Sequence, residues 1–313
     1  MNIGLRLYYR EQEEYFGLTS HIPGFGYRLL AGTVDLRLRL ELLGHRLIPL
    51  SQANLESLDV VIVFDIDAQI YQEVLQLPPS IPCILICMES PIYSPHSHDL
   101  SILAHPRWRR ILTWNRAIRL PNVIYYDIPI ADGIPLNTDY SMSTVSQKGV
   151  AIANPAKSQR GLPPRRDSLY LDLAAQGIID LYGNHWPYIP DRGLHGSAQD
   201  KIATIEKYSY SLVIENCVCS GYVTEKLADS VLARRPAIYY GDNETAQGRF
   251  AGTFILLKEL SLESFLESLS ELRKYKDELE KSIDVCRQNS FNWCNSFSEE
   301  VIKAICECYA SPS

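Results

Sequence analysis

Short apolar runs alternate with segments of helical periodicity along most of the chain. Such runs are typical of strands that are buried on both faces, and they lie at residues 2–8, 46–50, 59–64, 82–88, 111–114, 123–126, 149–153, 178–182, 210–214, 237–240 and 254–257. Helical spacing is found at residues 29–43, 68–77, 165–176, 198–207, 224–233, 261–272, 274–287 and 299–309. Strands that alternate with helices predict doubly wound parallel sheets.

One polar segment interrupts this alternation. Residues 131–148 (ADGIPLNTDYSMSTVSQK) are rich in Ser, Thr and Asp and are typical of a linker. We therefore expect two Rossmann-like α/β domains, at residues 1–147 and 148–289, with a helix within 290–313 that packs back on the first domain. Two such domains facing across a cleft form the GT-B architecture of many glycosyltransferases, although a fold does not by itself define a function.

Composition limits the kinds of partner and the cellular compartment that we expect, and it does not change the predicted fold class. The chain has 313 residues, of which 46% are hydrophobic and 21% charged, as in globular proteins. A net charge of −7 argues against a nucleic-acid coat, and no apolar run approaches the roughly 20 residues that span a bilayer. The eight cysteines form no CxxC pair, which favours free thiols in a reducing compartment. We expect a soluble cytoplasmic protein, with peripheral membrane contact as an open alternative.

Most of the candidate binding residues lie within residues 208–241, a stretch whose pattern predicts a strand, a loop, a helix and a second strand. Polar side chains follow the first strand and open the helix; they are Glu215, Asn216, Tyr222, Glu225 and Lys226. Ligands of open α/β sheets bind beyond the carboxyl ends of strands and at helix N-termini. Two carboxylates, an amide and an ammonium group at this place indicate a ribose and a phosphate.

Two groups of cations are candidates for binding that phosphate. The helix macrodipole disfavours a lysine near a helix start, so Lys226 is easier to explain if an anion lies beside it. The loop after the strand at 149–153 carries Lys157, Arg160, Arg165 and Arg166. Arginine binds diphosphate oxygens in bidentate fashion. A solvated basic loop and a solvated lysine are the alternatives.

Glu89 is a candidate general base. It follows the buried run at 82–88, and a carboxylate at the tip of a strand that faces a cleft is well placed to accept a proton. The alternative is an ordinary loop glutamate.

Two further patterns favour structural explanations. Asp65-Ile66-Asp67 matches the DxD triplet that binds a divalent ion and a nucleotide-sugar in a glycosyltransferase architecture other than GT-B, but it flanks a helix start, where Asp is a favoured cap. His96, His98 and Asp99 have the side chains of metal ligands, but histidines in a loop rich in Pro and Ser are commonly solvated. The sequence therefore predicts no metal site.

The stretch ENCVCSGYVTEKLADSVLARRPAIYYG resembles the signature of the α-1,3/4-fucosyltransferases, glycosyltransferase family 10. The positions that fit are Glu215, Asn216, Tyr222, Thr224, Glu225, Lys226, Pro236, Tyr239 and Gly241. Other family segments are similar to Glu89-Ser90-Pro91, to Asn154-Pro155 followed by Arg166, Tyr170 and Leu173, and to Lys201 followed by Tyr208-Ser209-Tyr210. Residues 111–130 match a further family segment only weakly. A chain without a membrane anchor is similar to the bacterial members.

The resemblance implies an inverting enzyme that transfers L-fucose from GDP-β-L-fucose to a hydroxyl of a glycan. Arg166 and Lys226 would neutralise the diphosphate, and Glu225 would bind the ribose hydroxyls or the fucose. Asn216 and Tyr222 would line the donor pocket, with Glu215 and Asn154 in the same donor-binding set. Glu89 would deprotonate the acceptor. Protein cations can stabilise the leaving GDP, so the resemblance implies no required metal or other cofactor.

Several alternatives stay open at this point. The donor is GDP-fucose or a related GDP-sugar such as GDP-arabinose, or the chain is a catalytically inactive nucleotide-sugar-binding homologue. Arg160 and Arg165 compete with Arg166 for the diphosphate. The glycan acceptor, the linkage and the oligomeric state are not specified by the sequence.

Overall fold

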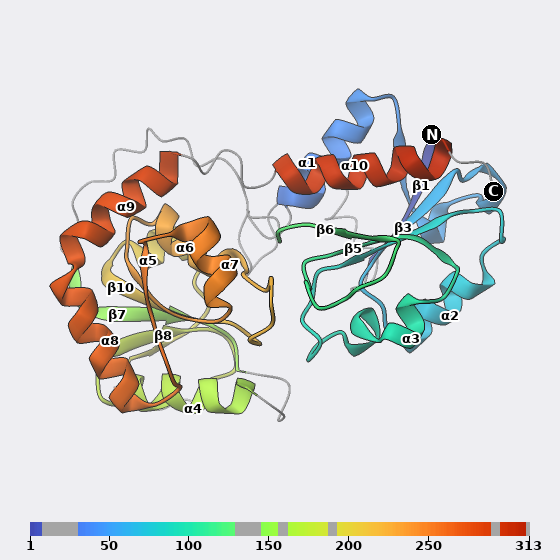
Figure 1. The fold of residues 1–313 in the computed structure, drawn as a ribbon. Helices are drawn as coiled ribbons and strands as arrows, with labels where there is room; N and C mark the ends of the chain where they lie inside the picture. The colour runs from blue at the N-terminus through green and yellow to red at the C-terminus, as the bar shows by residue number, and fades with distance from the viewer. Residues whose placement is uncertain (8–30, 129–144, 156–161, 187–192, 289–294, 311–313) are drawn as a thin grey trace. The chain divides into compact units, whose positions relative to one another are not determined.

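The computed structural model describes residues 1–7, 31–128, 145–155, 162–186, 193–288 and 295–310 (Figure 1). The chain divides into two compact units. Unit 1 comprises Met1–His21, Tyr27–Ala131 and Cys294–Ser313, and unit 2 comprises Ile22–Gly26 and Asp132–Trp293. Each unit is built around one parallel sheet, as the alternating pattern of strands and helices predicted.

Unit 1 contains a six-stranded sheet in the order β2-β1-β3-β4-β5-β6, and every neighbouring pair is parallel. Its strands are β1 (Asn2–Leu7), β2 (Arg46–Pro49), β3 (Val60–Phe64), β4 (Cys83–Cys87), β5 (Trp108–Thr113) and β6 (Val123–Tyr125). All five residues of β3 and all five of β4 are buried. Strands covered on both faces need apolar side chains in both directions, which explains the continuous runs VVIVF and CILIC.

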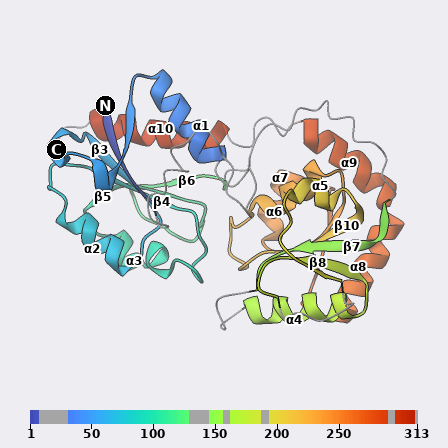
Figure 2. The ribbon, with the colours of Figure 1, turned by 180° about the vertical axis from the view of Figure 1, so that it is seen from behind.

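Helices cover both faces of this sheet (Figures 1 and 2). They are α1 (Ala31–Leu42), α2 (Ala68–Gln76), α3 (Leu100–Leu103) and α10 (Asn295–Ala310). The two views place α1 and α10 together on one face and α2 and α3 on the other.

The last helix of the chain is an integral part of unit 1. The ring of Phe297 in α10 lies 6.4 Å from that of Phe64 and 5.3 Å from that of Tyr126. Ser298 Oγ donates a hydrogen bond of 2.6 Å to Asp35 Oδ2 in α1. Arg110 Nε lies 3.1 Å from Glu307 Oε2. The chain therefore returns to its first unit after completing the second.

Unit 2 contains a second six-stranded parallel sheet, in the order β12-β11-β10-β7-β8-β9. Its strands are β7 (Ser146–Ile152), β8 (Ile179–Tyr182), β9 (Leu194–His195), β10 (Tyr208–Ile214), β11 (Ala237–Tyr240) and β12 (Phe254–Leu256). Its helices are α4 (Leu162–Ala175), α5 (Lys201–Ile205), α6 (Glu225–Leu232), α7 (Asn243–Phe250), α8 (Leu262–Lys274) and α9 (Lys276–Gln288).

Separate apolar clusters fill the two faces of the unit 2 sheet. Leu173 of α4 and Phe265 of α8 belong to the larger cluster, together with Leu212 of β10. Ile202 of α5 and Leu232 of α6 belong to the other. Because successive side chains of a strand point to opposite faces, β7 contributes Val150 to one cluster and Ala151 to the other. The strand β10 also contributes to both, but there the change of face coincides with a register shift between Tyr208 and Tyr210.

The strand order reverses direction once in each sheet. In unit 2 the chain passes from β7 outward through β8 to β9, and then returns to β10 on the other side of β7. In unit 1 the reversal falls between β1 and β3. Ligands of open α/β sheets bind at the carboxyl ends of the strands that flank such a switch point.

The structure differs from the sequence prediction at short elements. The helices α3 and α7 and the two-residue strand β9 were not predicted. The predicted linker 131–148 was wrong at its end, because β7 begins at Ser146, whose N–H donates to Lys207 O at 2.8 Å. A polar strand end carries no apolar signal. Residues 129–144 lie outside the described part of the chain. The predicted helix 198–207 is shorter, since Asp200 caps α5.

Replacing Phe297 with alanine tests the place of α10 in unit 1. The side chain is 1% exposed, so we expect a loss of about 3 to 4 kcal/mol in the free energy of unfolding of unit 1. Tyr309→Ala in the same helix is the control, because Tyr309 is 66% exposed. Chemical denaturation followed by tryptophan fluorescence measures both. Equal effects of the two changes would show that α10 does not pack into the unit 1 core.

Candidate active site

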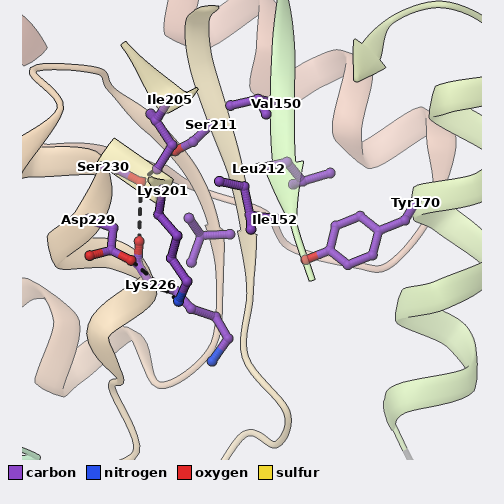
Figure 3. A pocket seen from close by; sticks show the side chains of 11 residues that line it. Val150, Ile152, Tyr170, Lys201, Ile205, Ser211, Leu212, Lys226, Asp229 and Ser230 are labelled. Carbon is purple, nitrogen blue, oxygen red and sulfur yellow. Dashed lines mark hydrogen bonds and ion pairs between the residues drawn. The ribbon is translucent and has the colours of Figure 1, made fainter. Parts of the chain in front are cut away.

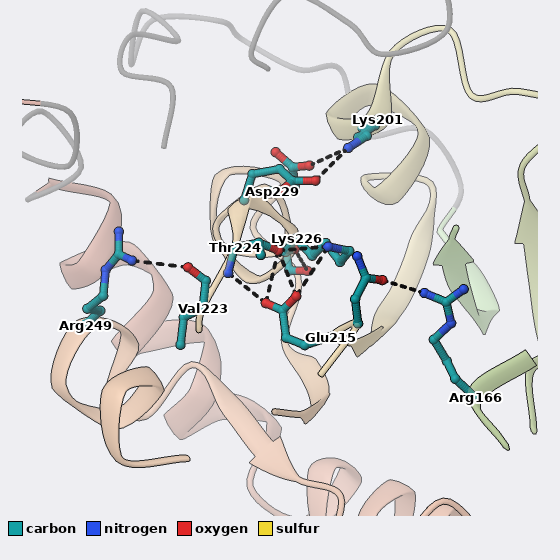
Figure 4. A network of polar contacts seen from close by, with 11 residues as sticks. Arg166, Lys201, Glu215, Val223, Thr224, Lys226, Asp229 and Arg249 are labelled. Carbon is teal, nitrogen blue, oxygen red and sulfur yellow. Dashed lines mark hydrogen bonds and ion pairs between the residues drawn. The ribbon is translucent and has the colours of Figure 1, made fainter. Parts of the chain in front are cut away.

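The polar signature residues of unit 2 gather at the switch point of its sheet. Asn154 follows β7, and Glu215 and Asn216 follow β10, the strand paired with it. Thr224 is the N-cap residue of α6. Figure 4 shows the side chains of Glu215, Thr224 and Lys226 converging. The predicted strand-loop-helix arrangement is therefore confirmed as a structure.

Glu215 is the centre of this network. It is fully buried, and its Oε1 accepts a hydrogen bond of 2.8 Å from the Thr224 backbone N–H. Its Oε2 accepts one of 2.8 Å from Thr224 Oγ1 and lies 3.3 Å from Lys226 Nζ. Lys226 Nζ also donates to Thr224 Oγ1 at 2.9 Å. The sequence grouped Glu215 with the donor-binding residues, and in this structure its carboxylate binds the start of α6.

Two glycines allow this loop to close. An added Cβ at Gly241 would lie 2.2 Å from Tyr239 Oη and 2.9 Å from Glu215 Cγ, so the close packing of these two buried side chains against the end of β11 requires glycine. Gly221 has a φ of +94°, a conformation that glycine adopts readily. Its N–H donates a hydrogen bond of 2.8 Å to Asp242 Oδ2. Asp242 thereby anchors the loop beside α7, a role that sequence spacing does not reveal.

Lys226 keeps its positive charge in a partly enclosed place. Its side chain is 21% exposed. Burial alone would lower the pKa of this ammonium group, but the Glu215 and Glu225 carboxylates outweigh burial and raise it. The group is therefore a fixed cation at neutral pH, beside the N-terminus of a helix.

Glu225 is held by a lysine that sequence reasoning placed in a motif without giving it a role. Lys201 Nζ lies 3.2 Å from Glu225 Oε1 and 3.7 Å from Asp229 Oδ2. Burial raises the pKa of Glu225, but Lys226 and Lys201 outweigh this effect and bring the pKa to about 2. Glu225 is thus an ionised acceptor of hydrogen bonds at any physiological pH.

A pocket lies between the central strands and the two helices α5 and α6 (Figure 3). Apolar side chains of β7 and β10 form its wall, including Val150, Ile152 and Leu212. Lys201 and Lys226 both line it, and Figure 3 shows their ammonium groups near each other. The Asp229 carboxylate also lines the pocket and lies 3.7 Å from Lys201 Nζ, so the polar part of the lining carries two ammonium groups and one carboxylate.

Arg166 of α4 joins the two strand ends. It is 3% exposed, and its guanidinium donates to Asn216 Oδ1 at 2.8 Å and to the Asn154 carbonyl at 2.9 Å. It also forms an ion pair of 2.8 Å with Asp167. Arg165, the neighbouring competitor for the diphosphate, is exposed. Arg160 and Lys157 lie outside the described residues.

The structure places the remaining donor-side residues at different depths. Tyr222 is 2% exposed and lies inside the signature loop, where its N–H donates to Cys219 O at 2.9 Å. Asn154 is exposed, and its Oδ1 accepts from the Asn184 N–H at 2.8 Å. Asn216 is half-buried beside Arg166. Asn154 and Asn216 thus lie at the edge of the site and Tyr222 beneath it.

Glu89 lies in unit 1, directly after β4 and Met88, and is half-buried. Asp65, expected to cap a helix together with Asp67, instead accepts hydrogen bonds from the backbone N–H groups of Met88 and Glu89. Asp67 does cap α2, because its side chain accepts from the Ile70 N–H at 2.8 Å. In the triplet, Asp67 is therefore a helix cap, and Asp65 is a buried carboxylate that binds the backbone after β4.

His98 was expected to be solvated, but the protein itself binds its imidazole. His98 Nε2 donates to the Glu89 carbonyl at 2.8 Å, and Asn115 Nδ2 lies 3.3 Å from His98 Nδ1. Both ring nitrogens of His98 are thus occupied by the protein. Asp99 caps α3, since its side chain accepts from the Ser101 N–H at 2.8 Å.

Comparison with known proteins defines the class and then the family. The match to the solved structure of an α1,3-fucosyltransferase covers 100% of this chain and 91% of that protein's chain, with a TM-score of 0.63 and 11% identity. An α-glucosyltransferase in complex with UDP and DNA covers 97% of this chain and 99% of its own, with a TM-score of 0.58 and 11% identity. At such identities the likeness shows the fold, which is the GT-B architecture of glycosyltransferases.

The family model described as glycosyltransferase family 10 (fucosyltransferase), C-terminal part, matches residues 147–310, more than half of the chain. The chain therefore belongs to glycosyltransferase family 10, and it is a glycosyltransferase. The comparison with curated protein sequences gives no significant match. Within the described ranges, none of the helices has both the length and the apolar character needed to cross a bilayer.

Replacing Glu215 with glutamine tests the network at its centre. The change keeps the shape, but it removes the charge that faces Lys226 and turns an amide N–H₂ toward groups that donate. We expect a loss of about 2 to 3 kcal/mol in the stability of unit 2. Glu267→Gln, on an exposed position of α8, is the matched control. A thermal-denaturation midpoint that falls no further for Glu215→Gln than for Glu267→Gln would contradict the network's role.

Proposed function

We propose that the chain transfers L-fucose from GDP-β-L-fucose to a hydroxyl of a glycan, with inversion at the anomeric carbon. The observation that supports this most strongly is the pair of cations, Lys226 and Arg166, at the switch point of unit 2. Both belong to segments that the family 10 model covers. A solved α1,3-fucosyltransferase with GDP-fucose has the same fold, with a TM-score of 0.59, 13% identity and coverage of 100% of this chain and 91% of its own.

The donor half of the reaction follows from the charges in unit 2. Lys226 supplies a fixed cation for the diphosphate, and Arg166, which is held by Asn216 and paired with Asp167, adds a second positive charge at the strand ends. Preorganised cations stabilise the negative charge that grows on a leaving phosphate. Glu225, ionised and held by Lys201, accepts hydrogen bonds from the ribose or fucose hydroxyls. The protein thus supplies the charges that a metal ion would otherwise bring to GDP.

The acceptor half needs a base. Glu89 takes the proton of the acceptor hydroxyl as its oxygen forms the new bond to the anomeric carbon. The bond from that carbon to the β-phosphate oxygen breaks at the same time, and GDP leaves with the electron pair. Attack on the face opposite the phosphate turns a β-linked donor into an α-glycoside. The roles of Glu89 and Lys226 are thereby complementary, because Glu89 removes the acceptor proton and Lys226 stabilises the negative charge that develops on the leaving GDP.

Lys226→Ala tests the donor site. Loss of the ammonium group removes the strongest attraction for the diphosphate, so we expect the Kd for GDP to rise by about 100-fold. Isothermal titration calorimetry with GDP measures it, and circular dichroism establishes that the variant is folded. Lys207→Ala is the matched control, since Lys207 is an exposed lysine of the same unit. A folded Lys226→Ala variant that binds GDP like the wild type would exclude the proposed donor site.

A glycan array assayed in turn with GDP-fucose and GDP-arabinose tests donor and acceptor together. We expect transfer from GDP-fucose to at least one glycan, and an α-linkage in the product by NMR. Glu89→Gln should lower that transfer by about 1,000-fold or more while leaving the Kd for GDP unchanged. Glu56→Gln, at an exposed position of unit 1, should keep full activity.

The other outcomes separate the alternatives. Transfer from GDP-arabinose alone would show that the donor is wrong. GDP binding without transfer from either donor would favour an inactive homologue that binds the nucleotide.

A further inference from the structure

Side chains bind all four backbone polar groups of the dipeptide Met88–Glu89. The N–H groups of Met88 and Glu89 donate to Asp65 Oδ1 and Oδ2, each at 3.0 Å. Trp114 Nε1 donates to the Met88 carbonyl at 3.0 Å, and His98 Nε2 donates to the Glu89 carbonyl at 2.8 Å. Beyond the end of β4, where sheet hydrogen bonds stop, three side chains thus continue to fix the backbone.

Asp65 is the most constrained of these three side chains. It follows β3, is 3% exposed and has a φ of +49°, a left-handed conformation that is unfavourable for most residues other than glycine. Ser97 Oγ accepts from the N–H of the next residue, Ile66, at 2.8 Å, and Ser94 Oγ donates to the Ile66 carbonyl at 3.1 Å. The left-handed turn directs the carboxylate across to β4.

The surroundings of Asp65 disfavour the ionised form of its carboxyl group. Burial and the nearby Glu89 carboxylate raise the pKa of Asp65 to about 7. The groups that favour its ionised form are the N–H groups of Glu89 and Met88 and the side chain of Ser97. The Cys87 thiol and the Tyr126 hydroxyl lie close by. The two backbone N–H groups stabilise the charged carboxylate, and the same two hydrogen bonds hold the Met88–Glu89 backbone in place.

We propose that Asp65 is a positioning residue for Glu89. Both its carboxylate oxygens bind the peptide that carries Glu89, so the base leaves the backbone at one fixed point and in one direction. This inference rests on the proposed role of Glu89 as the general base. A base must be held within about 0.5 Å of its productive position, and a backbone clamp from a rigid strand end supplies such a hold. The two aspartates of the triplet thus have different roles: Asp67 caps α2, and Asp65 holds the backbone of Glu89.

Asp65→Asn is the first test, with Asp67→Asn as the matched control from the same triplet. Asparagine keeps one acceptor oxygen and turns an N–H₂ group toward the other backbone N–H, so one of the two amides loses its partner. Asparagine caps a helix as well as aspartate does, so Asp67→Asn should behave like the wild type. In Asp65→Asn, hydrogen exchange measured by mass spectrometry should be at least tenfold faster in the peptide that contains Met88 and Glu89.

Kinetics with GDP-fucose and the glycan that gives most product on the array provide the second readout. We expect Asp65→Asn to lower kcat by 10-fold to 100-fold, with the KM for GDP-fucose and the Kd for GDP unchanged. In the Glu89→Gln background the same change should have no further effect on kcat, because the group that Asp65 positions is already gone.

The possible results separate the two proposals. Full activity of Glu89→Gln would overturn the role of Glu89, and the positioning role with it. An inactive Glu89→Gln variant together with an unchanged exchange rate or kcat in Asp65→Asn would overturn the positioning role alone. An equal loss of kcat from Asp65→Asn in both backgrounds would also overturn it. Asp65→Ser, which removes the charge and keeps a hydroxyl acceptor, repeats the test if Asp65→Asn does not fold. If neither variant folds, Asp65 is a structural residue and the proposal is wrong.

Discussion

The buried carboxylate of Glu215 is the constraint on which the unit 2 site depends. It lies at the carboxyl end of a central strand, and it binds the first residues of the helix that follows the signature loop. A buried carboxylate needs hydrogen bonds and an opposite charge, and Thr224 and Lys226 supply them. The same contacts fix Lys226 at the N-terminus of α6 and keep it protonated. The positive charge of Lys226 is therefore maintained by a neighbouring buried carboxylate.

Unit 1 uses the same physical device at the end of another strand. Asp65 is a buried carboxylate after β3, and it holds the backbone of the residue proposed to react. In both units a fully enclosed acid orders a more exposed ionisable group: Glu215 orders Lys226 and Asp65 orders Glu89. Parallel sheets favour this arrangement, because the carboxyl ends of neighbouring strands bring residues distant in sequence to one edge. The sheets thus provide rigid strand ends, and the buried acids attached to them fix the position of the neighbouring ionisable side chain.

The sequence predicted the parts of the structure whose signal is local. Runs such as VVIVF and CILIC predict buried parallel strands, and the signature stretch predicts strand, loop and helix at nearly the observed bounds. Short elements such as β9 and α3 have too few residues for a period to emerge. Carboxylates were the harder case. Spacing identifies Glu215 and Asp65 as acids near a strand end, but whether an acid turns toward solvent or toward a backbone amide is decided by tertiary contacts. Asp65 is directed by a left-handed turn that no local pattern marks.

A crystal structure of the protein with GDP would test the central claim most directly, since that claim places the diphosphate at the switch point of unit 2. We predict that a phosphate oxygen lies within about 3 Å of Lys226 Nζ, with Glu215 still bound to Thr224 and with the Arg166 guanidinium beside the diphosphate. A diphosphate bound away from Lys226, or a GDP molecule at any other edge of the sheet, would contradict this account.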